Sequence, residues 1–310
     1  MNAALLPRVS LSPAELHHTP QLREMAQRAM GIGMNVSMLA RDLGNMHYGY
    51  STNLEFGDTR REGAELICGL LSEMSEYEQV EPEEPFYELV STVARDHLVH
   101  GRCVFELFDA REDDDSPLLP RLGVLPGWSL RSRRGISYQI APAGTEVVWR
   151  ALPAASLVEF RLPDRLGRIL RRTGERLRAL DAFKAIDLDE FPAGYDFTVH
   201  QRMLDEMAVK ATASIGWSHL SGLMSRATSN FQVYRRLQLV RTWIVIVSAV
   251  AETVNCVIAA PCVHGRSPCS FRVAGLPSLE RVDAAMVAVT TGDQTLDEIS
   301  RSVLRTMRPA

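Results

Sequence analysis

The chain has 310 residues, of which 46% are hydrophobic and 23% are charged, a composition that lets a soluble globular protein bury a sizeable core. Its formal net charge of −4 excludes a strong bulk attraction to nucleic acid or to an anionic membrane surface. At this length, one large domain or two smaller ones are expected.

The N-terminal part of the chain has helical patterns. A first helix, capped either at Thr19 or at Ser12–Pro13, is predicted to run to about Leu43, with a kink at Gly31 and Gly33. Two further helices are predicted over 61–78 and 86–100, because apolar residues recur there at helical spacing. Gly101 is placed to end the last of these helices.

The pattern then changes to strand-like alternation. Residues 102–110, RCVFELFDA, predict one strand, and four short segments bounded by Pro, Gly or Arg predict four more. Helices that lead into antiparallel strands indicate an α+β fold, so residues 1–160 are predicted to form a mixed helix and antiparallel-strand body. The four short strands are expected at 119–126, 136–142, 145–153 and 156–163.

Residues 164–184 predict a helix with two stripes, one rich in leucine and one basic. A solvated helix surface is one interpretation of the basic stripe. The other is contact with phosphate groups or with an acidic neighbouring subunit. The basic stripe consists of Arg165, Arg168, Arg172 and Arg176.

A long helical pattern over 203–255 is interrupted by Ser, Thr and Gly near 212–216 and again near 225–230. Its second half is so apolar that it requires packing partners on more than one side. Residues 161–260 are therefore predicted to be a mainly helical region. Residues 261–310 are predicted to add a short strand and C-terminal helices, the last of which begins with a Thr-x-x-Glu capping box.

No membrane segment or signal peptide is expected. The longest apolar run, residues 243–251, is enclosed by Arg241 and Glu252 and is too short to span a bilayer. The first residues lack the charged and apolar regions of a secretory signal. The odd number of cysteines, five, indicates free thiols in a reducing cytoplasm.

Three cysteines and one histidine near the C-terminus are the candidate metal ligands. Thiolates and an imidazole can form a tetrahedral zinc site, but the spacing C-x5-C-x-H-x4-C matches no zinc module, and free thiols are the favoured interpretation. The chain has no phosphate-loop, dinucleotide-binding, nucleophile-elbow or zincin motif, so neither an enzyme nor a cofactor is predicted. The candidate ligands are Cys256, Cys262, His264 and Cys269.

Four segments, taken in order, resemble the portal proteins of tailed bacteriophages, in the form of a short or reduced member. The first is a helix that ends in glycine and leads into an aromatic and acidic strand, FYELVSTVARDHLVHGRCVFELFD. The second is the series of short strands LPRLGVLPGWSL, GISYQIAP and WRALPAASLVEFRLP. The third is KATASIGWSHLSGL followed by FQVYRRLQLVRTWIVIVSAVAETVNCVI, and the fourth is FRVAGLPSLERVDAAMVAVTTGDQTLDEISRSV.

This resemblance implies a non-enzymatic ring subunit, usually a dodecamer, with a wing-like α+β body, stem-type helices and a C-terminal helical segment. The ring would sit at a capsid vertex of the virion after assembly in the bacterial cytoplasm, and double-stranded DNA would pass through it without sequence recognition. The implied partners are further copies of the chain, the major capsid protein, the terminase and the head–tail connector. The chain departs from the family in its short length and in the little room that 187–198 leaves for a β-rich clip.

The ring interpretation gives two sets of residues a role. The basic stripe is expected to face the channel or a neighbouring subunit. Four apolar residues of the long helix are expected to pack subunits together: Trp243, Ile244, Val247 and Val250. The alternatives are a helical scaffold or adaptor of another bacterial or prophage complex, and a small zinc-binding protein.

Overall fold

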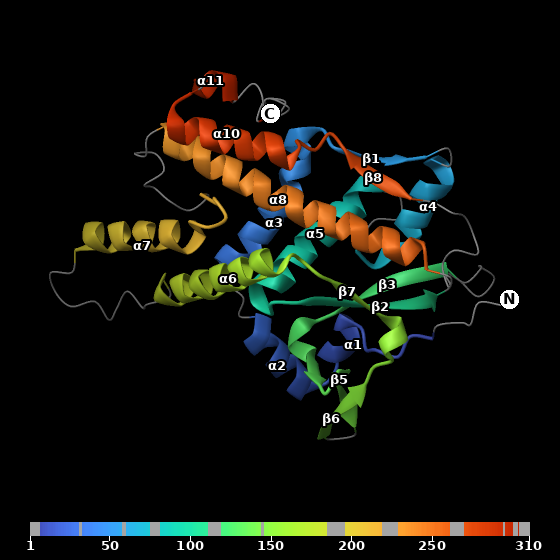
Figure 1. Ribbon diagram of the computed structural model, residues 1–310. Coiled ribbons are helices and arrows are strands. Elements are labelled where there is room, and N and C mark those ends of the chain that lie inside the picture. The colour runs from blue at the N-terminus through green and yellow to red at the C-terminus, as the bar shows by residue number, and fades with distance from the viewer. Residues whose placement is uncertain are drawn as a thin grey trace.

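The computed structural model describes residues 7–30, 33–57, 60–74, 81–110, 119–143, 146–184, 196–218, 229–260, 270–293, 295–299 and 303. Helices and antiparallel sheets are mixed along these residues, which confirms the α+β prediction. In Figure 1 the longest helices cross the middle of the molecule, one small sheet lies at the upper right, and the other sheets lie lower.

The predicted first helix is divided into α1 (Pro13–His17), α2 (Pro20–Met30) and α3 (Met34–Tyr50). Ser12 and Glu15 form a capping box that starts α1. Pro20 has no backbone N–H and therefore begins a new helix rather than continuing the old one. The predicted start at Thr19 therefore agrees with α2, whereas one continuous helix from Ser12 was wrong. The predicted kink at the glycines is a break between α2 and α3.

The next helices pack in the centre of the molecule. α4 (Arg60–Leu70) continues into a short 3-10 turn, η1 (Ser72–Met74), and α5 (Glu83–Val99) follows. Gly44 of α3 lies so close to α5 that an added Cβ would meet the Ser91 side chain. Gly101, at φ +74°, donates its N–H to the Asp96 carbonyl and ends α5 as predicted.

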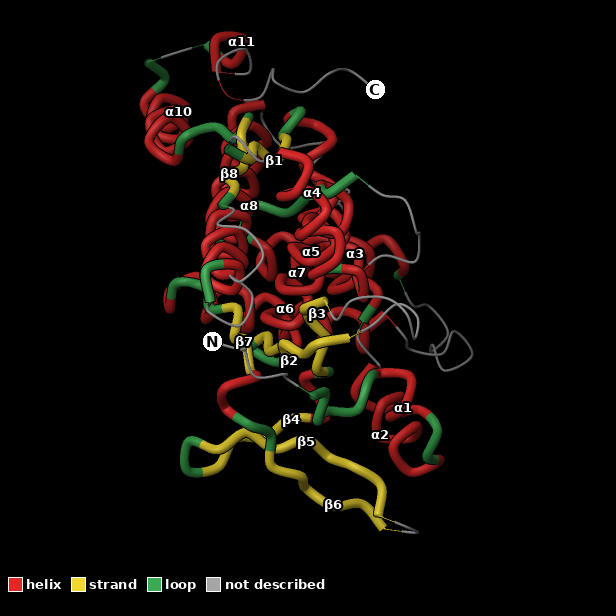
Figure 2. Tube along the Cα trace, turned by 90° about the vertical axis from the view of Figure 1, so that its right-hand side faces the viewer, coloured by secondary structure: helices red, strands yellow, loops and turns green. Residues whose placement is uncertain are grey.

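Three small antiparallel sheets follow the predicted strand order. β2 (Cys103–Ala110) is the central strand of the first sheet, between β3 (Leu119–Leu125) and β7 (Leu157–Phe160). β4 (Leu130–Arg133), β5 (Ile136–Ala143) and β6 (Glu146–Ala151) form a separate meander, which Figure 2 shows below the helices. The sequence reasoning did not identify β4.

The third sheet joins segments that are far apart in the chain. β1 (Asn53–Phe56) pairs with β8 (Phe271–Ala274), and Glu55 forms an ion pair with Arg272 at 2.6 Å. The Asn255 side chain accepts the Phe271 N–H at 3.0 Å and donates to the Phe271 carbonyl at 2.9 Å. The strand near the C-terminus is thus fixed to the helix that precedes it.

The C-terminal half is mainly helical. It contains α6 (Asp164–Lys184), α7 (Phe197–Thr212), α8 (Ser229–Ile258), α10 (Leu279–Thr291) and α11 (Leu296–Ile299). α6 has the predicted bounds, and the capping box before α11 is present: the Thr295 N–H donates to the Glu298 carboxylate at 2.8 Å, and the Glu298 N–H donates back to the Thr295 hydroxyl.

Several residues of the portal-like segments have structural roles. Glu106, in the aromatic and acidic strand, is buried and accepts the N–H groups of Val9 and Ser10 at 3.0 and 2.9 Å. Arg235 of α8 is 2% exposed, and its guanidinium donates to the Thr212 hydroxyl at 2.7 Å and to the Trp217 carbonyl. These contacts secure the N-terminal segment to the sheet and the end of α7 to α8.

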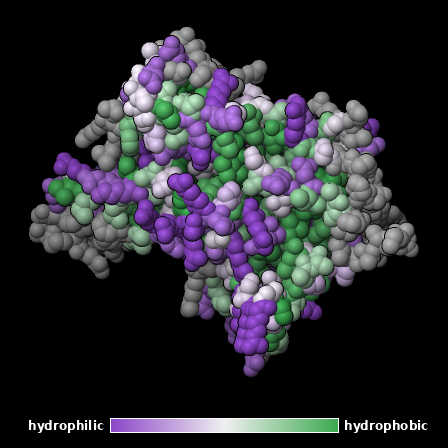
Figure 3. Space-filling view, in the orientation of Figure 1, coloured by the Kyte–Doolittle hydropathy of each residue, from purple (hydrophilic) through white to green (hydrophobic). Residues whose placement is uncertain are grey.

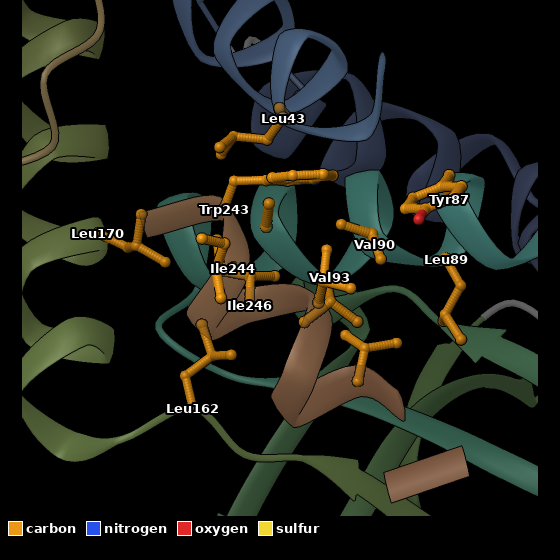
Figure 4. Packing of buried hydrophobic residues seen from close by; sticks show 14 of the residues in the cluster. Leu43, Tyr87, Leu89, Val90, Val93, Leu162, Leu170, Trp243, Ile244 and Ile246 are labelled. Atoms are coloured by element: carbon orange, nitrogen blue, oxygen red, sulfur yellow. The ribbon is translucent and has the colours of Figure 1, made fainter. Parts of the chain in front are cut away.

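The long helix α8 belongs to the main core. Figure 4 shows Trp243 beside Leu43 of α3, and Ile244 and Ile246 near Val93 of α5. The four residues expected to pack subunits are 0–4% exposed within this single chain. They cannot reach a neighbouring copy in this fold, so the assignment of Trp243, Ile244, Val247 and Val250 to subunit packing was wrong; they fill the core of the chain itself.

Among the described residues, α8 is the helix whose length and composition would allow it to cross a membrane, and half of its most apolar window is buried inside the molecule. A core helix of a soluble protein passes the same test. The main core also contains residues from all three predicted regions, 1–160, 161–260 and 261–310. Those regions share one core rather than having a separate core each.

Candidate nucleic-acid and subunit interface

Helix α6 is held against α5 by one apolar face and one glycine. Leu170, Leu177 and Leu180 are buried, as the leucine stripe predicts. Gly174 lies directly on the end of α5, because a Cβ added there would collide with the carbonyl oxygen of Leu98. This contact leaves the opposite faces of α6 to solvent.

The basic stripe lies on those outer faces. Its four arginines are separated by three, four and four residues, so they share one side of the helix over about 16 Å. All four are exposed: Arg165, Arg168, Arg172 and Arg176. Figure 3 shows hydrophilic residues gathered over the part of this face where α6 lies in Figure 1.

Three of the four arginines have no partner among the described residues. Arg176 donates from Nη1 to the Lys210 carbonyl of α7 at 3.4 Å. Arg165, Arg168 and Arg172 form neither a hydrogen bond nor an ion pair with any part of the chain that the structure describes. The structure therefore brings the four predicted arginines together in one exposed row.

Helix α7 lies beside this row and adds an apolar surface. Asp196 caps its N-terminus by accepting the N–H groups of Thr198 and Val199. Val199 and Met203, four residues apart on one face, are 48% and 50% exposed. The segment 187–198, which was predicted to limit a clip, lies mostly outside the described residues.

A pocket opens at the N-terminal end of the same row. Its volume is about 510 Å³, and it lies between the end of α5, the end of β7 and the first turns of α6. Arg168 is the residue of the predicted stripe that lines it. Of the other charged lining residues, Asp164 and Arg171 lie on α6 itself. The remaining three lie outside the helix, so helical periodicity alone did not reveal them: Arg102, Glu159 and Arg161.

A buried carboxyl lies next to this pocket in the chain. Burial raises the pKa of Asp96 to about 6, although Arg95 and a hydrogen bond from Cys103 oppose that shift. Asp96 is 5% exposed, and its Oδ2 has no hydrogen-bond partner. The same burial raises the pKa of Cys103, so this thiol is held in its protonated form.

Replacing Asp96 with asparagine is expected to stabilise the protein relative to the native chain. This difference in the free energy of unfolding should grow as the pH rises from about 4 to about 6. The folded chain holds the Asp96 proton more tightly than the unfolded chain, whose pKa is ~3.9, so the native protein loses stability across this window. The relative gain at pH 7.5 should be on the order of 2 kcal/mol. Urea unfolding at several pH values measures it.

Glu88→Gln, at an exposed position of the same helix, is the control and should show no such trend. A stability difference between Asp96→Asn and the native protein that is equal at pH 4 and pH 7.5 would contradict the raised pKa. A stability difference that does not change with pH would report only how well the asparagine amide fits the buried site.

The candidate metal ligands are not brought together by the described structure. Cys256 is exposed on α8, and Cys262, His264 and Cys269 lie outside the described residues. Among the residues that are described, no group of three His, Cys, Asp or Glu side chains could hold a metal ion. The zinc alternative therefore stays a prediction.

No protein-family model matches the chain, and a search of curated proteins found no significant match.

Proposed function

We propose that this chain is the subunit of a homo-oligomeric ring of the portal type, through which double-stranded DNA passes. The observation on which this rests is a row of exposed arginines along one long helix, three of which have no partner in the described part of the chain. The row consists of Arg165, Arg168, Arg172 and Arg176. Together with the order of the four portal-like segments, it favours a surface made for phosphate groups or for an adjacent subunit.

The arrangement of α6 and α7 is consistent with such a subunit. The two helices lie side by side, linked by the Arg176 hydrogen bond to α7, and extend to one side of the body in Figure 1. A closed ring requires two different contact surfaces on each subunit. The arginine row and the apolar face of α7 around Val199 and Met203 offer two surfaces of different character.

The charge of the chain suits a conduit better than a tight DNA binder. Phosphate contacts set non-specific affinity, and a strongly basic chain would hold the DNA that it has to let pass. Here the net charge is −4, and the arginine row is a local exception. The capsid protein, the terminase motor and the head–tail connector are the proposed partners of the assembled ring.

The native mass of the purified protein, by light scattering with negative-stain images of the same fraction, tests the ring. We expect a species of many subunits, each of 34.5 kDa, with a central hole. A protein that stays monomeric or dimeric at high concentration would contradict the ring and favour the scaffold or adaptor alternative.

Changing the four arginines of the row to glutamine together is expected to leave the fold intact, because all four are exposed. If the row faces a neighbouring subunit, the ring should be lost. If it faces the channel, the ring should persist, and the dependence of DNA affinity on salt should fall by up to about 0.9 in log–log slope for each phosphate contact removed.

The control removes the same amount of charge from scattered exposed positions: Arg41, Arg61, Arg150 and Arg281. An effect of the row variant no larger than that of this control would contradict the proposed role. Melting temperature, measured on both variants, separates a loss of assembly from a loss of folding.

A further inference from the structure

The pocket beside the arginine row has the size of a small-molecule site. Its volume of about 510 Å³ lies within the usual range of ligand pockets. Three separate segments form its walls: the end of α5 with His97 and the turn that follows it, the end of β7 with Phe160, and the start of α6 with Gly167. His97, Phe160 and Leu162 are buried, so this part of the wall is preformed. Five charged lining residues are exposed: Glu159, Arg161, Asp164, Arg168 and Arg171.

The charged groups of the pocket favour an anion. Four guanidiniums line it against two carboxylates, and one of those carboxylates, Glu159, is paired with Arg161 at 2.6 Å. Arg171 is paired with Glu175, outside the lining, at 3.2 Å. Arg168 has no partner in the described part of the chain, so its positive charge is available to a ligand.

The start of α6 supplies further donors. The first N–H groups of an α-helix have no partner within the helix, and the positive end of the helix dipole lies there. Gly167, in the first full turn of α6, lines the pocket and has no side chain to fill it. Several separate donors favour a phosphate group, which offers three terminal oxygens, over a carboxylate with two.

A buried histidine provides an independent sign of a ligand. His97 is 5% exposed, and its Nε2 lies 2.9 Å from the Phe160 carbonyl oxygen. A carbonyl only accepts, so Nε2 holds the proton, and Nδ1 of the neutral ring is an acceptor. Nδ1 is buried without a hydrogen-bond partner, and it faces Gly167, where an added Cβ would lie 3.9 Å away.

We propose that this pocket binds a small phosphate ester that also has a hydroxyl or amine donor. The phosphate group contacts Arg168 and the N-terminus of α6, and the donor satisfies Nδ1 of His97. Duplex DNA fits less well, because a phosphodiester inside a continuous duplex brings one charge and no donor into a concave site. The site does not depend on the ring, and its ligand is distinct from the DNA of the proposed function.

Calorimetric titration of the full-length protein with ribose 5-phosphate tests the proposal, since this probe combines a phosphate monoester with hydroxyl donors. We expect a dissociation constant in the millimolar range or tighter, and weaker binding of inorganic phosphate, which has no sugar hydroxyls for His97. Equal binding of both probes would mean an adventitious ion only and would overturn the proposal, as would no binding of ribose 5-phosphate.

Two variants with matched controls locate the site. Arg168→Gln is expected to weaken ribose 5-phosphate about tenfold or more, because a charge-assisted hydrogen bond is lost. Arg172→Gln removes the same charge one turn away, outside the pocket, and should change affinity less than about twofold. Both belong to the arginine row, so an equal loss in the two would indicate a diffuse surface field and reject the pocket.

Gly167→Ala fills the space in front of His97 without a steric clash, since the new Cβ would be at ordinary contact distance from Nδ1. Alanine also favours a helix, so the melting temperature should be unchanged or higher while binding falls about tenfold or more. Gly69→Ala in α4, where an added Cβ meets nothing within 4 Å, is the control and should bind normally.

Asp164→Asn is expected to tighten ligand binding, whereas Arg168→Gln and Gly167→Ala are expected to weaken it. Its carboxylate lines the pocket in the first turn of α6 and repels an anion, so its removal is expected to tighten ribose 5-phosphate several-fold. Weaker binding in this variant would contradict an anion in the pocket. A short DNA duplex that displaces the bound sugar phosphate would instead assign the pocket to the nucleic-acid backbone and overturn the small-ligand proposal.

Discussion

Replacing Ile244 with aspartate is expected to unfold the protein rather than to separate intact subunits. Ile244 is 4% exposed in the single chain and lies in the main core with Trp243 and Val247. An ionised carboxylate there has no partner and loses its hydration, which is among the largest single-residue penalties, about 4 kcal/mol or more. Circular dichroism and urea unfolding of the purified variant measure the loss.

Ser248→Asp is the control, because Ser248 is exposed on the same helix one turn further along. It should keep the native melting temperature within a few degrees. A folded Ile244→Asp chain that has lost only its assembly would show that Ile244 faces a neighbouring subunit after all. That result would require α8 to pack differently from the arrangement in Figure 4.

The burial of Ile244 inside a single chain could not be predicted from the sequence. The pattern of α8 correctly indicated that it needs apolar partners on several sides. A sequence does not show whether those partners belong to the same chain or to another copy, because both bury the same residue types. The structure decides it through tertiary contacts: Tyr50 of α3 lies 5.2 Å from Trp243, ring centre to ring centre.

Local patterns predicted the elements well where strong signals enclose them. Pro163 precedes α6 and the leucine stripe is regular, so the bounds and the buried face of this helix could both be predicted. β4 was missed because its four residues, LRSR, are polar and mostly exposed. A short strand of this kind is recognised only by its pairing with β5, which no local pattern reveals.

The candidate site shows the same division. The arginine row lies within one helix, so the 3.6-residue period was enough to place its members on one side. The pocket combines Arg102, Glu159 and Arg168, which only the packing of α5, β7 and α6 brings together. Its most informative feature is Nδ1 of His97, which is buried without a partner. That atom is an acceptor because Nε2 donates to the carbonyl of Phe160, a residue 63 positions away in the sequence.

Gly174→Ala is expected to destabilise the protein by about 2 kcal/mol or more, although helix propensity alone predicts a gain of up to about 1 kcal/mol. An added Cβ would collide with the carbonyl oxygen of Leu98, and a backbone atom in a packed helix cannot move aside as a flexible side chain can. α6 has to shift away from α5, and its arginine row shifts with it. Urea unfolding gives the change in stability.

Gly167→Ala is the matched control, seven residues earlier on the same helix, where the new Cβ has ordinary contact distance to its neighbour. This variant should be as stable as the native protein or more so. If both variants gain stability alike, the close contact between α5 and α6 is wrong. The other outcome is that Gly174→Ala alone is destabilised and loses the assembly or the ligand, while Gly69→Ala retains both. In that case the position of α6 on α5 sets the geometry of the arginine row and of the pocket.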